Sequence, residues 1–283
     1  MNWRNSIGQL ELGQKIALGF LMIIVVMALV APLVVLDHTA NANDMDLRRA
    51  LLGPGSSTDM GLHLFGTDKY GRDLLSRILV GARISFSIGF VAVFISLLIG
   101  LFLGSIAGYF GGKWDKLIMW IINVTWSIPT LLLVIAITLA LGKGFWQVFI
   151  AVGLTMWVEV ARIVRGQVMS VKEMQYVTAA RALGFTDFRI ILKHILPNIL
   201  APVIVISAAN FAAAILIESG LSFLGIGAQP PMSSWGAMIK DHYNYIILGK
   251  PYLALIPGLC IMSLVMAFML IGNSLRDALD VKA

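Results

Sequence analysis

Long uncharged stretches alternate along the chain with shorter segments that carry its charges. A helix that crosses the hydrocarbon core of a bilayer needs about 20 consecutive, mostly apolar residues. Six stretches approach or exceed that length, so we expect an all-α polytopic membrane protein with about six transmembrane helices. These stretches are residues 16–36, 86–110, 117–141, 145–164, 198–217 and 252–275.

Local features modify two of these stretches. Pro129 lies near the middle of the third and is expected to kink it, because proline cannot donate a backbone hydrogen bond. Glu159 and Arg162 lie near the end of the fourth, so its membrane-embedded part is expected to end near Val158. Residues 219–239 are also uncharged, but their glycines and prolines predict a connecting loop with short helical pieces.

The first stretch lies close to the N-terminus, where signal peptides also occur. It contains 21 uncharged residues, whereas the apolar core of a signal peptide has about 7–15. We therefore expect a retained span, although residues 40–42 (Ala-Asn-Ala) are similar to a cleavage site. This predicts a cytoplasmic N-terminus at 1–15, a first span at 16–36, an external loop at 37–83 and a five-helix core at 84–283.

The end of the external loop is expected to form a short amphipathic helix over residues 73–83. Its apolar positions share one helical face, which is typical of a helix that lies on the membrane surface. Asp73 and Arg77 are one turn apart and are expected to pair. The apolar positions are Leu74, Leu75, Ile78, Leu79 and Ala82.

Composition supports the membrane assignment. Of 283 residues, 59% are hydrophobic and 13% are charged, whereas about 25% charged residues are typical of a soluble domain. With both termini cytoplasmic, twelve Lys and Arg residues lie inside and nine outside, a small excess in the direction of the positive-inside rule. We attribute the net charge of +6 to basic residues that set the membrane topology and contact anionic lipid, rather than to nucleic-acid binding. Cys260 is the single cysteine, which excludes an intrachain disulfide.

Residues 171–197 predict two helices joined by a tight turn on the cytoplasmic side. The first helix is expected over 171–183, with Gly184 as its left-handed C-terminal residue. Thr186 is expected to cap the second helix, and Pro197 marks the start of the fifth span. Small residues near the turn let another protein approach the backbone, so we interpret the segment as a docking element. These small residues are Ala179, Ala180 and Ala182.

Two other interpretations of this segment stay open. One is that the alanines pack against the spans of the chain itself. The other is a DNA-binding helix-turn-helix, because the spacing of Ala180 and Gly184 is similar to that motif. The second helix argues against DNA binding, since apolar residues such as Phe188 and Ile190 cannot read base edges.

Polar side chains within the apolar stretches are candidates for a translocation pathway, because such groups are costly in a bilayer and often face a cavity. For the neutral ones, an interhelical hydrogen bond is the more common role. The one charged candidate is expected at the membrane interface, where its charge costs less. The candidates are Asn123, Ser127, Asn210 and Glu218.

The segment around Gly184 resembles the EAA loop of binding-protein-dependent ABC importer permeases. In that loop Glu-Ala-Ala is followed at fixed spacing by Gly and then by Ile-x-Leu-Pro. Here Thr178 stands in place of the acidic residue and His194 in place of the isoleucine. The matching positions are Thr178, Ala179, Ala180, Gly184, Leu196 and Pro197.

Four further segments, at 66–77, 218–227, 229–236 and 275–280, resemble the dipeptide/oligopeptide/nickel branch of this family. The long first loop is similar to that of its C-type permease. The resemblance implies a type I ABC importer permease fold. It also implies that the segment 171–197 couples the permease to ATPase subunits. The residues with this implied role are Tyr176, Thr178, Ala179, Ala180, Gly184, Leu196 and Pro197.

The resemblance also implies the partners and the location. Such permeases bind no ATP, and the sequence has no G-x-x-x-x-G-K-[ST] loop. Two cytoplasmic subunits are expected to bind ATP and Mg, a second permease to complete the channel, and an extracytoplasmic solute-binding protein to deliver the solute. The chain is then a non-catalytic subunit of the bacterial inner membrane, in contact with lipid and without a cofactor or metal. Dipeptides, longer peptides, nickel chelates and oligosaccharides stay open as substrates.

Two other functional classes are considered. A stand-alone secondary transporter or channel often has inverted repeats or buried ionisable residues, and neither occurs in the five cleanest stretches. An intramembrane enzyme needs a catalytic constellation within a span, but all four histidines are expected in loops. These are His38, His63, His194 and His242.

Overall fold

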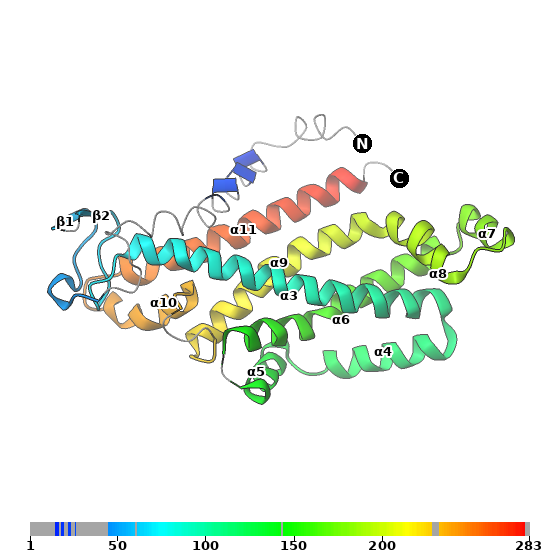
Figure 1. Cartoon of the computed structure of the whole chain (residues 1–283), viewed down its shortest axis with the longest axis horizontal. Coiled ribbons are helices and arrows are strands. Elements are labelled where there is room, and N and C mark those ends of the chain that lie inside the picture. Colours follow the sequence, from blue (N-terminus) through cyan, green and yellow to red (C-terminus); the bar gives the residue numbers. More distant parts are fainter. Residues whose placement is uncertain are drawn as a thin grey trace.

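The computed structural model is almost entirely helical within the residues that it describes (Figure 1). Most of the first expected span, 16–36, lies outside these residues, as do His38 and the possible cleavage site at 40–42. The described residues are 45–59, 61–142, 144–227 and 232–280, together with scattered helical residues between Lys15 and Val26.

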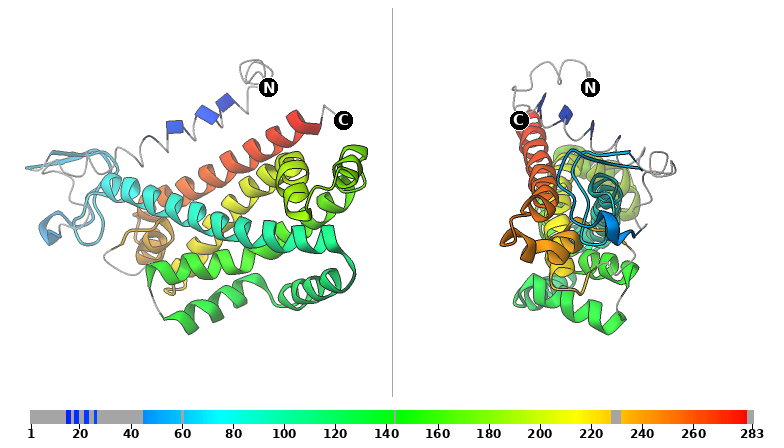
Figure 2. Two further views of the ribbon diagram at one scale, coloured as in Figure 1. Left: turned by 45° about the vertical axis from the view of Figure 1, so that its right-hand side comes forward. Right: turned by 90° about the vertical axis from the view of Figure 1, so that its left-hand side faces the viewer.

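Apart from α5, which is bent by 92° from α4, the long helices run side by side in one elongated bundle, and short elements lie at its two ends (Figures 1 and 2). The long helices are α3 (Leu74–Phe110), α4 (Gly112–Trp126), α5 (Thr130–Leu141), α6 (Phe145–Val171), α9 (Leu200–Phe223) and α11 (Tyr252–Asp280). The short elements are η1 (Leu47–Arg49), the antiparallel strands β1 (Ser56–Thr58) and β2 (Gly61–His63), α7 (Gln175–Ala182), α8 (Asp187–Ile190), η2 (Ile191–Ile195), η3 (Leu196–Ile199), α10 (Trp235–His242) and η4 (Tyr243–Ile246).

Four helices of the described region are long and apolar enough to cross a membrane, and a bent pair adds a fifth if it counts as one span. These five correspond to the second to sixth stretches of the sequence. The four are Leu74–Phe110, Trp146–Val171, Asp187–Phe223 and Tyr252–Asp277, and the bent pair is Gly112–Trp126 with Thr130–Leu141.

The third expected stretch is two helices rather than one kinked span. α4 ends at Trp126, α5 begins at Thr130, and their axes differ by 92°. Pro129 lies directly before α5 with a ψ of 126°, which is outside the helical range. A disruption at Pro129 is therefore confirmed, and it is a full break.

The surface helix expected at 73–83 is wrong, because these residues begin α3, which continues unbroken to Phe110. Their apolar stripe is buried in the protein: Leu74 and Ile78 belong to one core cluster with Trp235 of α10. Trp235 Nε1 also donates a hydrogen bond of 3.0 Å to the Ile78 carbonyl. The expected boundary between the loop and the core, at residue 83, falls inside this helix.

The expected pair between Asp73 and Arg77 is also wrong. Asp73 caps α3 by accepting a hydrogen bond of 2.8 Å from the Ser76 amide, and its other oxygen lies 2.9 Å from His63 Nδ1. Arg77 Nε instead lies 3.5 Å from Asp68 Oδ2. Because Asp68 and Arg77 are both buried, their opposite charges compensate each other inside the fold.

Glycines allow α3 and α6 to pack closely along much of their length. A Cβ atom at Gly104 would lie 2.6 Å from the Ala161 carbonyl oxygen, and one at Gly100 would lie 2.5 Å from Val160 Cβ. Small residues at four-residue spacing are a common device for close helix contact in membranes. This contact makes α3 and α6 the centre of the bundle.

Candidate functional site

The α7–α8 hairpin (residues 175–190) projects from one end of the bundle, opposite the end that carries β1, β2 and α10 (Figures 1 and 2). α6 runs on to Val171, and Met174 then adopts an extended backbone with a ψ of 145°. This extended residue separates the two helices, so the prediction that the first helix begins at residue 171 is wrong. α7 begins at Gln175.

The turn between the two helices follows the prediction closely. Gly184 has a φ of +77°, the left-handed conformation that glycine adopts without steric cost. The Gly184 amide donates to the Arg181 carbonyl and the Phe185 amide to the Ala180 carbonyl, which is a Schellman motif. Thr186 occupies the N-cap position with an extended backbone, although its side chain forms no capping bond.

The hairpin is fixed to the bundle through its inner face. Val177, Ala180 and Ile190 are buried in one cluster with Val164 and Val168 of α6. This packing confirms the alternative role for Ala180, contact with the chain's own spans. The hairpin therefore cannot rotate without disturbing α6.

The outer face of the hairpin is exposed and partly apolar. Leu183 and Phe188, on either side of Gly184, are 75% and 73% exposed. Neither residue was among those expected to have a coupling role, although large apolar side chains beside a predicted turn are a recognisable signal. Of the residues with an implied coupling role, Tyr176, Thr178, Ala179, Gly184 and Pro197 are exposed, Leu196 is half-buried and Ala180 is buried.

After α8 the chain continues into α9 through two distorted turns. η2 is π-helical and η3 is a 3₁₀ turn with Pro197 near its start. Proline lacks the amide that would continue the α-helical ladder, and such distortions restore the remaining bonds. Pro197, expected to mark the start of the fifth span, thus lies at a change of helical pitch within the continuous run Asp187–Phe223.

The four pathway candidates do not come together. Asn123 and Ser127 are exposed near the end of α4, where Asn123 Oδ1 accepts a hydrogen bond of 3.1 Å from Arg162. Asn210 and Glu218 are buried in α9. Glu218 is fully buried within the protein near the end of α9 and accepts a hydrogen bond of 2.6 Å from Ser222; its expected place at the membrane interface stays a prediction.

The histidine expectations also need correction. His63 lies in β2, His194 in η2 and His242 in α10, rather than in loops. His242 is buried, and its Nδ1 lies 2.8 Å from the Met238 carbonyl oxygen. These histidines lie in three different elements and do not form one site.

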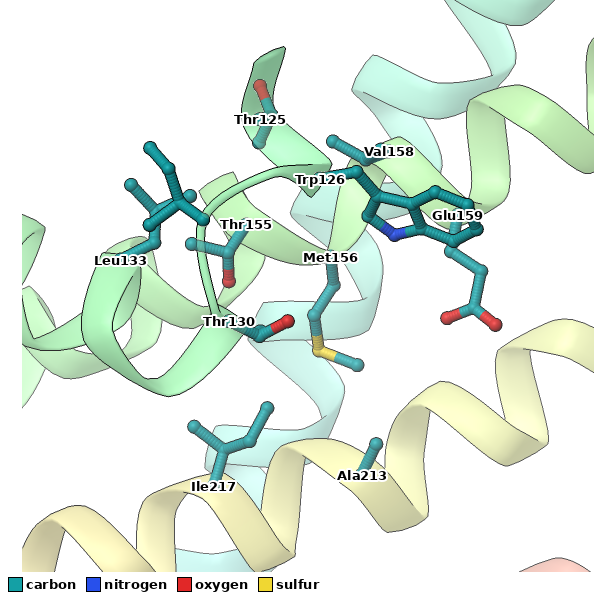
Figure 3. A pocket seen from close by; sticks show the side chains of 11 residues that line it. Thr125, Trp126, Thr130, Leu133, Thr155, Met156, Val158, Glu159, Ala213 and Ile217 are labelled. Atoms are coloured by element: carbon teal, nitrogen blue, oxygen red, sulfur yellow. The ribbon is translucent and has the colours of Figure 1, made fainter. Parts of the chain in front are cut away.

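A cavity of about 190 Å³ lies at the break between α4 and α5, where these helices face α6 and α9 (Figure 3). Its lining includes Thr125 and Trp126 of α4, Thr130 of α5 and Thr155 and Glu159 of α6. α6 continues unbroken past Glu159 to Val171, and the end of its membrane-embedded part near Val158 stays a prediction. None of the four pathway candidates is among the described residues that line this cavity.

A family model described as "Binding-protein-dependent transport system inner membrane component" matches residues 100–282, a region that contains the hairpin and the cavity. The chain belongs to this family. This permease is thus the transmembrane subunit of an ABC importer, a multi-pass protein of the inner membrane, and it is not the catalytic subunit. The stand-alone transporter, the intramembrane enzyme and the DNA-binding protein are set aside.

Two relatives of this permease agree with the assignment. The dipeptide transport system permease protein DppC of Alkalihalophilus pseudofirmus is 40% identical over 282 residues, which cover 99% of this chain and 90% of that protein. The glutathione transport system permease protein GsiD of Escherichia coli is 42% identical over 220 residues, or 78% of this chain and 72% of that protein.

A solved structure confirms the permease fold. A chain of the MetNI methionine ABC transporter, in an inward-facing conformation, superimposes with a TM-score of 0.59. The match covers 72% of this permease and 97% of that chain at 19% identity, so the likeness concerns the fold alone.

Proposed function

We propose that this permease moves short peptides inward across the membrane. One relative is named for dipeptide transport and the other for the transport of glutathione, which is a tripeptide, and both names support this substrate class. In the proposal, an extracytoplasmic solute-binding protein delivers the peptide and a second permease completes the channel. Two partner subunits bind ATP and Mg and supply the energy.

The proposed orientation places both termini and the α7–α8 hairpin in the cytoplasm. The hairpin and the turns after it carry Arg181, Arg189 and Lys193, in agreement with the positive-inside rule. The end of the bundle with α10 then faces outward, toward the solute-binding protein.

The observation that carries the proposal is the two-sided construction of the hairpin. Its inner side chains, such as Val177 and Ile190, are buried against α6, whereas Leu183 and Phe188 are exposed. Exposed apolar anchors on a helical turn fit an apolar groove on a partner protein. We assign that groove to an ATP-binding subunit.

Coupling follows from this construction. When ATP draws the two partner subunits together, a hairpin held in its groove moves with them, and α6 and α9 move with the hairpin. The partners shift the permease between inward- and outward-open states only by as much as their affinity differs between those states. Because the inner side of the hairpin is packed against α6, the hairpin transmits the movement of the ATP-binding subunits to the transmembrane helices.

The test is a paired substitution on the outer face. Leu183→Asp combined with Phe188→Asp is expected to reduce co-purification of the ATP-binding subunits and ATP-dependent peptide uptake together. Leu248→Asp is the matched control, since Leu248 is also exposed but lies between η4 and α11. Equal recovery of the ATP-binding subunits with both variants would overturn the proposal.

A further inference from the structure

Glu159 places an exposed carboxylate on the side of α6 that borders the cavity. It lies close to the midpoint of α6, Phe145–Val171, and its neighbour Val160 packs directly against Gly100 of α3. An ionisable group near the middle of a spanning helix is costly in lipid and normally faces a water-filled cavity or an opposite charge. Glu159 must therefore have a polar environment when the protein is in the membrane.

The described part of the chain places no opposite charge in contact with this carboxylate. Arg162 is one turn away on the same helix, but its guanidinium lies 3.8 Å from the centre of the Trp126 ring. Arg162 Nη2 also donates a hydrogen bond of 3.1 Å to Asn123 Oδ1. The nearest cation along the helix is thus held by other groups.

Glu159 instead lines the cavity at the break between α4 and α5 (Figure 3). The hydroxyl-bearing residues Thr130 and Thr155 line the same cavity. Thr155 donates its hydroxyl hydrogen to the Val152 carbonyl at 2.8 Å, so its oxygen keeps acceptor capacity. The C-terminal end of α4, which carries partial negative charge, also borders the cavity. These groups favour a cation that donates several hydrogen bonds.

The size of the cavity limits what it can hold. Sites that enclose a whole drug-sized ligand have volumes of about 300–1,000 Å³, whereas this cavity measures about 190 Å³. It therefore accommodates one end of a peptide. The N-terminal end is a primary ammonium group with three donors and one positive charge, which complements a carboxylate and hydroxyl oxygens.

We propose that Glu159 and the cavity at the α4–α5 break bind the N-terminal ammonium group of a peptide in transit. This inference rests on the proposed function, since it names the part of the substrate that this permease contacts. Glu159 is then a substrate-binding residue, and the α4–α5 break provides the space beside it. The bond formed is a charge-assisted hydrogen bond, which breaks again when the peptide leaves.

The experiment uses the complete importer, purified through this permease and reconstituted in proteoliposomes with its solute-binding protein. Uptake of a labelled dipeptide and of its N-acetylated form is measured below saturation for wild type, Glu159→Gln and Glu159→Asp. The same solute-binding protein serves all variants, so its own preference cancels when variants are compared for one peptide. Asp277→Asn, at an exposed position near the end of α11, is the matched carboxyl-to-amide control.

We expect Glu159→Gln to lower uptake of the free dipeptide about tenfold or more, the scale of one lost charge-assisted hydrogen bond. Glu159→Asp keeps a carboxylate and should retain most of the uptake, and uptake of the N-acetylated peptide, where wild type transports it, should change little. Unchanged uptake with Glu159→Gln, or an equal loss with Gln and Asp, would overturn the inference. A wild-type complex that imports no peptide would instead refute the proposed function.

Discussion

The Tyr109 hydroxyl donates a hydrogen bond of 2.6 Å to Asp187 Oδ1, and these residues belong to the last turn of α3 and the first turn of α8. The guanidinium of Arg181, at the end of α7, lies 5.7 Å from the centre of the same tyrosine ring. One aromatic side chain thus contacts both helices of the hairpin. It ties the hairpin to α3, in addition to the packing against α6.

Tyr109→Phe removes this hydrogen bond but keeps the ring. We expect the hairpin to loosen, so that peptide transported per ATP hydrolysed falls about two- to tenfold, in line with the net contribution of one hydrogen bond. The ratio is measured in proteoliposomes from parallel uptake and phosphate-release assays. Tyr243→Phe, at the opposite end of the bundle, is the control, and an unchanged ratio in Tyr109→Phe would show that the bond is dispensable.

Substitutions at the two neighbouring alanines of α7 are expected to have different effects, one on folding and the other on docking. Ala180 is 3% exposed, so Ala180→Leu overpacks the core and should destabilise the hairpin by about 1–3 kcal/mol. Ala179 is exposed, so Ala179→Leu should leave folding intact and weaken only the contact with an ATP-binding subunit. Limited proteolysis reports the first effect and co-purification the second. Proteolysis that is equally fast in both variants would contradict this division.

Replacing glycine by alanine is expected to change the melting temperature in opposite directions at the α3–α6 contact and at an open position of α6. Gly104→Ala forces a methyl group to within 2.6 Å of the Ala161 carbonyl oxygen and should lower the melting temperature in detergent. Gly166→Ala meets no atom within 4 Å and should raise it slightly, because alanine favours a helix by up to about 1 kcal/mol over glycine. A rise with Gly104→Ala would show that the two helices separate easily.

The burial of His242 predicts that the end of the bundle with α10 is sensitive to acid. Burial lowers the pKa of His242 below its ordinary value of 6.5, with Lys69 acting in the same direction and the Met238 carbonyl, Asp68 and Asp241 acting against it. The folded state therefore binds protons less readily than the unfolded state. Stability from the neutral imidazole is complete above about pH 6.5 and falls as the pH decreases.

We expect protease cleavage near α10 to be faster at pH 5 than at pH 7.5. His242→Gln should remove most of this difference, because glutamine does not titrate. Cleavage sites within α7 serve as the internal reference, since they report acid effects that do not involve His242. An identical pH dependence in wild type and His242→Gln would exclude the histidine as the cause.

The proposed orientation is tested by labelling single cysteines from either side of the membrane. In a Cys260→Ala background, Leu183→Cys should react with an impermeant maleimide only when the cytoplasmic face is accessible. Leu248→Cys should react from outside in intact cells, because both leucines are exposed but lie at opposite ends of the bundle. Labelling of Leu183→Cys in intact cells would reverse the topology.

The elements with strong local signals were predictable. Uncharged length located the spans because apolar helices alone satisfy their backbone groups in lipid. Gly184 located the turn because few other residues adopt a positive φ there. The EAA pattern around Gly184 led to the correct family without any three-dimensional information.

Features that depend on distant partners were not predictable from local patterns. Arg77 was expected to pair with Asp73, because its buried partner Asp68 was not apparent from local spacing. Pro129 indicated a disruption between α4 and α5, but no local pattern revealed that a cavity opens there beside Glu159 of α6. The exposure of Leu183 and Phe188 likewise depends on how the hairpin packs on α6.

α3 has 37 residues and is about 55 Å long, well beyond the roughly 30 Å hydrocarbon thickness of a bilayer. Near one end it accepts the hydrogen bond from Trp235, and at the other Tyr109 binds Asp187. A single unbroken helix thus contacts both the surface proposed for the solute-binding protein and the hairpin proposed for the ATPase. If the solute-binding protein binds at one end of α3, a tilt of this single helix is enough to move the hairpin on the opposite side of the membrane. No chain of side-chain rearrangements between the two ends is then required.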